Sequence, residues 1–187
     1  MPNKEMAFVK KCLNNDKTSQ ELLYRRNAAK MLGVCLRYSR NKMDAEDILQ
    51  EGFIKVFRYL KNFKGKGSLE GWIKRIIINT AINYYKANLK HTGQQDITDY
   101  SKDVNLKNEI IDELTINELL EYIRKLPEGY RMVFNLSVIE GYSHKEVAEK
   151  LNISLNTSKT QLFRARRALR QMIIKQNEYI IDYENRN

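Results

Sequence analysis

Residues 143–169 read SHKEVAEKLNISLNTSKTQLFRARRAL, and this stretch decides the fold of the C-terminal half. Ser143 followed by Glu146 has the S-x-x-E spacing of a capping box, in which both side chains satisfy N–H groups at a helix start. Residues 152–154 are too few for anything but a tight turn before a second helix, which Ser154 caps. The stretch therefore predicts a helix-turn-helix.

The second helix of this pair has two chemically different sides. At about 100° per residue, one side is expected to face the core: Leu155, Ser158, Leu162, Ala165, Leu169, Met172 and Ile173. The opposite side is basic and polar: Asn156, Lys159, Thr160, Phe163, Arg166, Arg167 and Arg170, with Arg164 at its margin. A solvated helix face usually mixes both charges, but residues 161–176 contain no acid. This side suits a DNA major groove, where arginines reach phosphates or guanine edges.

Composition points to the same class of partner. The chain has 187 residues, 42% of them hydrophobic and 30% charged, which allows one or two packed domains. Its formal net charge of +10 favours a polyanion, nucleic acid before a membrane surface. Cys12 and Cys35 stand apart, so we expect buried core thiols in a reducing compartment. No signal peptide or membrane-spanning run is visible, which predicts a cytoplasmic protein without membrane insertion.

The chain as a whole is predicted to be all-α, with two small helical domains joined by a flexible linker. Apolar residues recur at the helical period, and only two prolines and eight glycines interrupt them. Helices are expected near residues 4–13, 19–40, 45–61, 69–88, 106–125, 127–139, 144–151 and 155–176. The predicted domains are residues 1–88 and 106–187, and the acidic and polar linker spans residues 89–105.

A second basic zone lies in the N-terminal half. Residues 52–90 hold nine basic side chains and one acid, whereas residues 96–121 hold eight acids and two lysines. Before this zone, Asp44 is expected to cap a helix, with Met43 and Ile48 as a hydrophobic staple. That helix also carries an acidic, partly apolar strip: Asp47, Gln50, Glu51 and Ile54. An ordinary solvated surface explains the strip equally well.

A glycine-containing loop, FKGKGS at residues 63–68, leads into the next predicted helix, capped by Ser68. One arc of that helix gathers aromatic, basic and amide side chains: Trp72, Arg75, Ile76, Asn79, Asn83 and Lys86. The asparagines could be structural or solvent-facing, or they could contact bases beside the basic loop. The loop lacks the spacing and the preceding strand of a nucleotide-binding phosphate loop.

Two blocks of the chain resemble the sigma-70 family of RNA polymerase sigma factors, in its extracytoplasmic-function group. DAEDILQEGFIKVFRYLKNFKGKGSLEGWIKRIIINTAINYYK, residues 44–86, is similar to region two of that family. LPEGYRMVFNLSVIEGYSHKEVAEKLNISLNTSKTQLFRARRAL, residues 126–169, is similar to region four. The resemblance implies a protein without a cofactor that binds core RNA polymerase and directs initiation at promoter DNA.

The resemblance also implies which residues act. Region two would bind the clamp helices of the polymerase β′ subunit through Asp47, Gln50, Glu51, Phe53 and Ile54. It would read the melted minus-ten strand through Phe63, Lys66, Ser68, Trp72, Arg75, Asn79, Asn83 and Lys86. Region four would dock on the β flap and read the minus-thirty-five duplex through Asn156, Lys159, Thr160, Phe163, Arg164, Arg166 and Arg167. The family makes an anti-sigma factor a plausible further partner.

The sequence departs from the family pattern at two places. Primary sigma factors carry paired tryptophans where this chain has Trp72 and Ile73, which implies limited melting power and strict promoter choice. Asn156 stands where many relatives have glycine at the turn, and asparagine tolerates unusual backbone angles. The linker, with Asp96, Asp99 and Asp103, is expected to act as an acidic mimic of nucleic acid inside the polymerase.

Three alternatives stay open at this point. A conventional helix-turn-helix regulator would explain the basic helix but not the second basic zone. An enzyme such as a nuclease is disfavoured, because the chain has only two histidines, His91 and His144, and no catalytic motif. We expect no catalytic and no metal site, and we expect His144 at the surface. A scaffold would leave the basic face without a role.

Overall fold

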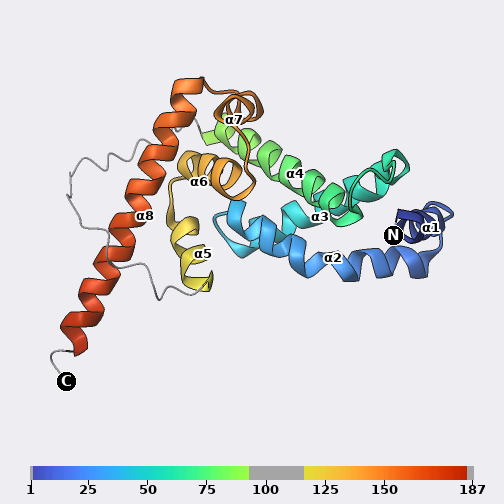
Figure 1. Cartoon of the computed structure of the whole chain (residues 1–187), viewed down its shortest axis with the longest axis horizontal. Helices are drawn as coiled ribbons and strands as arrows, with labels where there is room; N and C mark the ends of the chain where they lie inside the picture. Colours follow the sequence, from blue (N-terminus) through green and yellow to red (C-terminus); the bar gives the residue numbers. More distant parts are fainter. Residues whose placement is uncertain (1, 93–115, 185–187) are drawn as a thin grey trace. The chain divides into compact units, whose positions relative to one another are not determined.

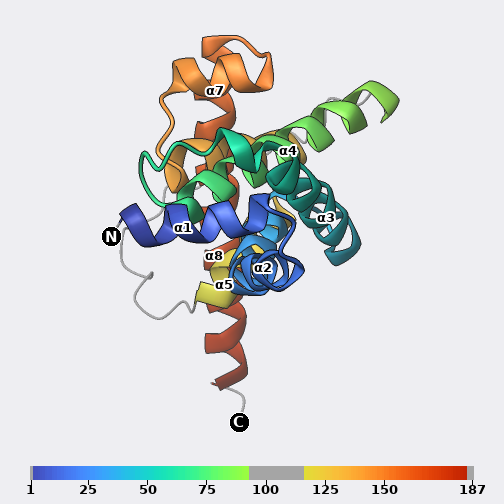
Figure 2. The same cartoon turned by 90° about the vertical axis from the view of Figure 1, so that its right-hand side faces the viewer.

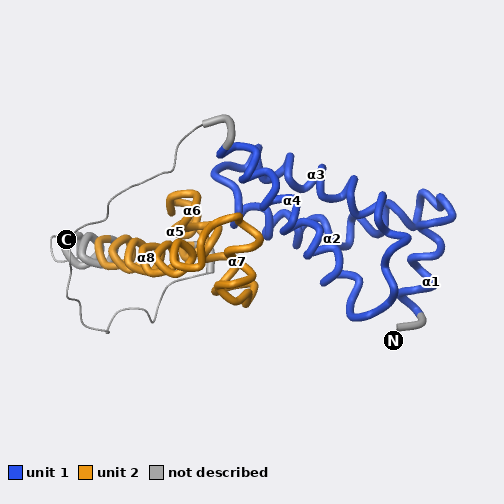
Figure 3. Tube along the Cα trace, turned by 90° about the horizontal axis from the view of Figure 1, so that it is seen from above, with its two compact units in different colours: residues 1–91 blue, residues 92–187 orange. Residues whose placement is uncertain are grey.

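The computed structural model describes residues 2–92 and 116–184, and within them every regular element is a helix. The chain divides into two compact units, residues 1–91 and residues 92–187 (Figure 3). The all-helical prediction is confirmed for the described part of the chain. None of the helices described there is long and apolar enough to cross a membrane.

The first unit contains four α-helices and one short 3-10 helix (Figure 1). They are α1 (Pro2–Leu13), α2 (Lys17–Tyr38), α3 (Lys42–Tyr59), the 3-10 helix η1 (Leu60–Asn62) and α4 (Leu69–Thr92). Their apolar faces meet in a core to which Leu23, Met31, Ile48, Val56 and Ile73 contribute. A β-carbon on Gly52 of α3 would overlap Ile77 Cδ1 of α4, so glycine permits the close approach of these two helices.

The start of α3 differs from the prediction. Asn41, not Asp44, is the N-cap: its Oδ1 accepts the Asp44 backbone N–H at 2.8 Å, and its Nδ2 donates to Asp44 Oδ2 at 3.0 Å. Both residue types cap helices well, and here the helix begins three residues earlier than predicted. Met43 is 70% exposed, so the predicted staple with Ile48 does not form.

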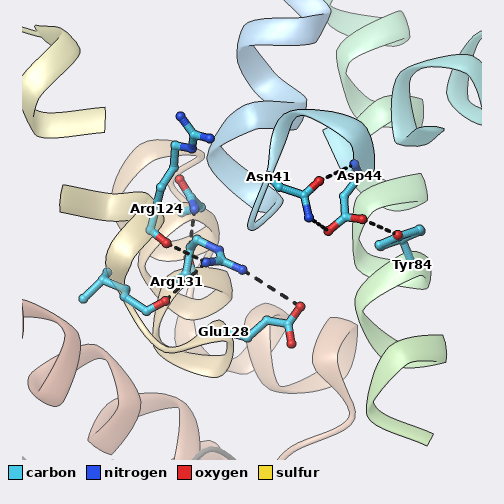
Figure 4. Close-up of polar contacts among 8 residues, drawn as sticks. Asn41, Asp44, Tyr84, Arg124, Glu128 and Arg131 are labelled. Atoms are coloured by element: carbon cyan, nitrogen blue, oxygen red, sulfur yellow. Dashed lines mark hydrogen bonds and ion pairs between the residues drawn. The ribbon is translucent and has the colours of Figure 1, made fainter. Parts of the chain in front are cut away.

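Asp44 instead joins α3 to α4. The Tyr84 hydroxyl donates to Asp44 Oδ1 at 2.9 Å (Figure 4). Burial, followed by the hydrogen bond to this carboxylate, raises the pKa of Tyr84. The phenol therefore stays protonated and keeps donating throughout the neutral pH range.

Both cysteines are buried and free, as predicted for core residues. Burial raises the pKa of the Cys35 thiol to about 12 and also raises the pKa of Cys12. Because the thiolate is the reactive form, both thiols are inert while the unit is folded.

Helix α4 extends four residues into the segment predicted as linker. It runs to Thr92, because residues 87–92 contain no glycine or proline that would end a helix, and Gly93 follows. The rest of the predicted linker, including Asp96, Asp99 and Asp103, lies outside the described residues. The same holds for residues 106–115 of the next predicted helix.

The second unit contains α5 (Ile116–Lys125), α6 (Glu128–Phe134), the π-helical turn η2 (Asn135–Ile139), α7 (His144–Leu151) and α8 (Leu155–Glu184). Its hydrophobic core joins α5, α6 and α8: Tyr122, Ile123, Leu126, Tyr130, Ala165, Ala168, Leu169 and Ile173. The sequence predicted one helix over residues 127–139, but its last turn widens to a π-helix in which the Glu140 N–H donates to the Asn135 carbonyl at 2.9 Å.

A buried arginine fastens α6 to the end of α5. Arg131 is 1% exposed, and its Nη1 donates to the carbonyl oxygens of Arg124 at 2.8 Å and Leu126 at 3.2 Å. Glu128 Oε1 lies 3.9 Å from Arg131 Nη2 (Figure 4). The last carbonyls of a helix lack partners within that helix and carry its negative dipole end, so the guanidinium satisfies and neutralises them.

Candidate nucleic-acid interface

Helices α7 and α8 form the predicted helix-turn-helix. Both halves of the capping box are present: the Glu146 N–H donates to Ser143 Oγ at 3.3 Å, and the Ser143 N–H donates to Glu146 Oε2 at 2.9 Å. The Ser143 hydroxyl also donates to Glu146 Oε2 at 2.7 Å, and this bond, followed by the one from the Ser143 N–H, lowers the pKa of Glu146. The turn ends with Ser154, whose Oγ accepts the Thr157 N–H at 2.9 Å as the cap of α8.

The left-handed residue of this turn is Asn152, with φ of 57°. The expectation that Asn156 would adopt an unusual backbone conformation at the turn is wrong, because Asn156 is the second residue of α8. Asn152 ends α7 in the conformation that glycine or asparagine adopts at lowest cost. Asn156 is thereby left exposed on the side of α8 that faces solvent.

A histidine and a buried serine connect the two helices. His144 Nδ1 lies 2.9 Å from Ser158 Oγ, which makes a hydrogen bond between the first residue of α7 and the second turn of α8. Ser158 is fully buried and His144 is half-buried. The expected surface position of His144 is therefore wrong: its partner is 14 residues away and invisible to local sequence patterns.

The two sides of α8 separate largely as predicted. Ser158, Leu162, Ala165, Leu169 and Ile173 are buried. Some positions differ from the prediction: Leu155 is 45% exposed because it begins the helix, Met172 is only half-buried, and Ala168 is buried. The predicted core side of α8 did not include Ala168, because a small alanine between arginines gives only a weak apolar signal.

The opposite side of α8 presents its cations and polar groups to solvent. Asn156, Lys159, Thr160, Arg164, Arg166 and Arg170 are exposed, and Phe163 is 66% exposed. Arg167 is half-buried, and Arg164 Nη1 lies 3.5 Å from the Tyr130 hydroxyl of α6. We call Asn156, Lys159, Thr160, Phe163 and Arg166 the α8 face.

Helix α4 presents a different exposed surface in the first unit. Arg75, Asn79 and Asn83 are exposed along it, and Trp72, Ile76 and Lys86 are partly exposed beside them. On the other side, Ile73, Ile77 and Ala81 are at most 1% exposed and anchor the helix in the core. We call Arg75, Asn79 and Asn83 the α4 face.

The loop before α4, residues 63–68, is anchored at both ends. Phe63 is 4% exposed, and its ring centroid lies 5.7 Å from that of Trp72. Ser68 Oγ accepts the Gly71 N–H at 3.1 Å as a cap of α4. Lys64, Lys66 and Ser68 are exposed, whereas the burial of Phe63 removes it from the surface on which the resemblance placed it.

The acidic strip of α3 is also at the surface. Asp47, Gln50 and Glu51 are exposed, Ile54 is 59% exposed, and Glu51 pairs with Lys55 at 2.6 Å. Phe53 is 3% exposed, and its ring centroid lies 4.7 Å from that of Tyr24. The side chain of Phe53 therefore belongs to the core beneath the strip and is not a surface contact.

The described residues were also compared with the ligand sets of metal sites. Across residues 2–92 and 116–184, no group of three or more His, Cys, Asp or Glu side chains lies close enough to hold a metal ion. The α4 face and the α8 face instead present cations and amides in solvent, with Trp72 and Phe163 as aromatic rings, and proteins contact phosphates and bases with such groups.

Comparison with known proteins identifies the family. The family model "Sigma-70 region 2" matches residues 23–90, and "Sigma-70, region 4" matches residues 116–169. The "ECF RNA polymerase sigma-E factor" of Haemophilus influenzae is 30% identical over 181 residues, which cover 90% of this chain and 95% of the relative. The chain belongs to the sigma-70 family, in its extracytoplasmic-function (ECF) group.

Other sigma factors are similar as well. The "RNA polymerase sigma-H factor" of Pseudomonas aeruginosa is 31% identical over 181 residues, covering 88% of this chain and 91% of the relative. A solved structure of the sigma factor RpoE in complex with the anti-sigma factor NepR from Bartonella quintana is 18% identical, covers 83% of this chain and 96% of that chain, and gives a TM-score of 0.49. The ECF sigma factor described here directs core RNA polymerase to promoter DNA, the activity that defines its family.

Proposed function

We propose that this sigma factor reads the minus-thirty-five element as duplex DNA through the α8 face. This proposal is supported by the exposure of the face and by its lack of acidic residues, while the opposite side of the same helix is buried in the core. A helix fixed in this way fits the major groove, where Lys159 and Arg166 can reach phosphates or guanine edges. Phe163 offers an apolar contact for a thymine methyl group.

We infer that the minus-ten element is read as a melted strand in the first unit. Asn79 and Asn83 each present an amide that can both donate and accept hydrogen bonds, as an unpaired base edge requires. Lys66, Ser68, Arg75 and Lys86 supply cations and a hydroxyl along the backbone of the strand. Trp72 offers a ring for stacking, which single-strand binding uses, and Phe63 supports that ring from the core.

Core polymerase is proposed to bind the acidic strip of the first unit. Asp47, Gln50 and Glu51 would meet the clamp helices of the β′ subunit, with Ile54 as an apolar contact. Phe53 would support this strip from beneath. The second unit is proposed to dock on the β flap, and an anti-sigma factor remains a prediction from the family.

We propose further that the protein acts in the cytoplasm as a non-enzymatic initiation factor without a cofactor. The alternative left open by the sequence, a conventional helix-turn-helix regulator, does not account for the match of residues 23–90 to region 2.

The deciding experiment is transcription in vitro on a fragmented genomic library, with core polymerase alone or with core polymerase and this protein. New start sites that share a two-part upstream motif are expected, and they would supply the promoter code. An Asn79→Ala chain and a Lys159→Ala chain, run in parallel, would assign each half of the motif to one face. If both variants lost the same half of the motif, or neither lost any, the assignment of the two faces would be wrong.

A further inference from the structure

Helix α1 lies outside the segment that matches region two, because that match begins at Leu23. In the structure it is nevertheless part of the first unit, where it packs against α2 and η1. Figure 2 shows α1 beneath the loop that connects η1 to α4. An element beyond the matched segment therefore adjoins the loop that is proposed to meet the minus-ten strand.

The contact between α1 and this loop runs through Met6 and Gly65. A β-carbon built on Gly65 would lie 3.1 Å from Met6 Sδ and 3.2 Å from Met6 Cγ, so the thioether lies directly over the glycine. Gly65 also has φ of 69°, a left-handed conformation that side chains disfavour. Gly65 is thus required by its backbone, and Met6 would have to shift by a few tenths of an ångström to admit a side chain there.

Gly67 provides a natural comparison in the same loop. Its φ is 84°, so it has the same conformational requirement, but a β-carbon there would meet nothing within 4 Å. Between the anchors at Phe63 and Ser68, the loop therefore has one glycine covered by α1 and one open to solvent. Comparing substitutions at the two glycines therefore separates the effect of backbone strain from the effect of contact with α1.

The packing of α1 near the start of α4 leaves an open pocket of about 290 Å³, lined by side chains of α1, α2 and the first turn of α4, among them Phe8, Leu23 and Leu69. Neither Met6 nor Gly65 lines this pocket. Besides its packing on η1, α1 therefore reaches the loop itself through the Met6 contact.

We propose that Met6 is a positioning residue: it fixes the loop at residues 63–68 in the conformation that binds the minus-ten strand, and so sets the affinity and base preference for that strand. This inference rests on the proposed role of the loop and the α4 face. A loop already held in its bound conformation loses less entropy on binding, which raises affinity without a new contact to DNA. The methionine is suited to this task because its flexible thioether fills irregular gaps.

The test uses the full chain assembled with core polymerase and single-stranded non-template oligonucleotides that vary at each minus-ten position. Four variants are compared: Met6→Ala, Gly65→Ala, the double variant with both changes, and Gly67→Ala as the matched control. Gly65→Ala is expected to weaken strand binding on the order of tenfold, and more than Gly67→Ala, because it adds a clash to the backbone strain. Adding Met6→Ala should recover part of that loss, and Met6→Ala alone should weaken binding on the order of threefold and flatten the base preference.

Thermal unfolding of each variant distinguishes positioning from a general loss of stability, and Met6→Leu should keep both stability and base preference. Equal losses for Gly65→Ala and Gly67→Ala, with no recovery in the double variant, would overturn the inference. If Asn79→Ala also left strand binding unchanged, the proposed reading of the minus-ten strand would itself fail. If Asn79→Ala weakened binding while Met6→Ala left affinity and preference intact, only the role of α1 would be rejected.

Discussion

Helices α4 and α8 both bury one side and expose the other, but they differ in charge and in what holds them. The α8 face carries cations on a helix that is fixed by its own core and by the bond between His144 and Ser158. The α4 face is richer in amides and lies beside a loop with two glycines at positive φ. A preformed cationic helix suits a regular duplex, whereas a melted strand has to be bound base by base. Charge and hydrogen-bonding groups are thus distributed according to the state of DNA that each unit is proposed to meet.

The largest expected effect is the loss of stability of the second unit, which carries the α8 face. Arg131→Ala leaves the carbonyls of Arg124 and Leu126 without their buried donor, so we expect a loss of roughly 3 kcal/mol or more in the free energy of unfolding. Circular dichroism should report early loss of helix, while fluorescence of Trp72, the single tryptophan, keeps its midpoint. Lys125→Ala, at an exposed position, should leave both signals within about 0.5 kcal/mol. A matching early shift of the fluorescence would show that the two units unfold together.

Replacing Asn79 should separate the two faces functionally. Asn79→Ala removes an amide from the α4 face, and we expect a loss of about 1–3 kcal/mol in open-complex formation at the minus-ten element. Binding to a minus-thirty-five duplex should not change, and neither should the salt dependence, because the amide is neutral. Footprinting and permanganate reactivity on the same promoter measure both steps. Equal loss at both elements would mean that the residue is structural.

On α8 the corresponding change is Lys159→Ala, with Arg164→Ala beside it. Either substitution should cost about 1–3 kcal/mol at the minus-thirty-five element if the side chain reads a base, with altered preference at one position. A phosphate contact would instead weaken all sequences alike and reduce the salt slope by about one. Affinities measured over a salt series on a library of minus-thirty-five sequences distinguish the two outcomes. Unchanged affinity in both variants would contradict the proposal that Lys159, on the α8 face, and Arg164 beside it contact the minus-thirty-five element.

A smaller effect should follow from the link between α7 and α8. Ser158→Ala removes a buried hydroxyl and is expected to cost about 1 kcal/mol of stability. His144→Ala should cost less in the Ser158→Ala background than in the native chain, because the bond at 2.9 Å is already lost. Denaturant unfolding of the four chains gives the coupling, and binding to minus-thirty-five duplex shows whether the angle between the helices has changed. Additive losses would mean that the bond contributes nothing to stability.

The smallest effect is the pH dependence of the capping box. Hydrogen bonds from Ser143 lower the pKa of Glu146 in the folded chain. A depressed folded pKa means that its stabilising contribution is complete above the unfolded value and is lost as the pH falls through the folded value. Amide hydrogen exchange in α7 should therefore become faster as the pH falls, and Glu146→Gln should reduce this pH dependence. Hydrogen exchange at α7 between about pH 3 and pH 6 would detect the difference. An identical profile in the variant would exclude Glu146 as its source.

Local patterns predicted much of the fold and the exposed sides of both helices, and the errors have two causes. The capping box at Ser143 and the opposite sides of α8 depend on residues within a few turns of each other, so the sequence displays them. His144 and Phe53 have partners in other helices, Ser158 and Tyr24, and no periodic pattern reveals such partners. The cap at Asn41 and the left-handed Asn152 were misplaced because neighbouring asparagine and aspartate residues give equivalent local signals.

Because one side of α8 is buried in the core and the other is proposed to read DNA, the helix has a consequence for how sigma factors and their promoters diverge. Asn156, Lys159, Thr160, Phe163 and Arg166 lie on the side of the helix away from the core, so substitutions there remove little of what keeps the unit folded. Such positions can vary under selection for a new promoter while the framework stays the same. A gene duplicate could therefore acquire a separate regulon through a few mutations on one side of one helix.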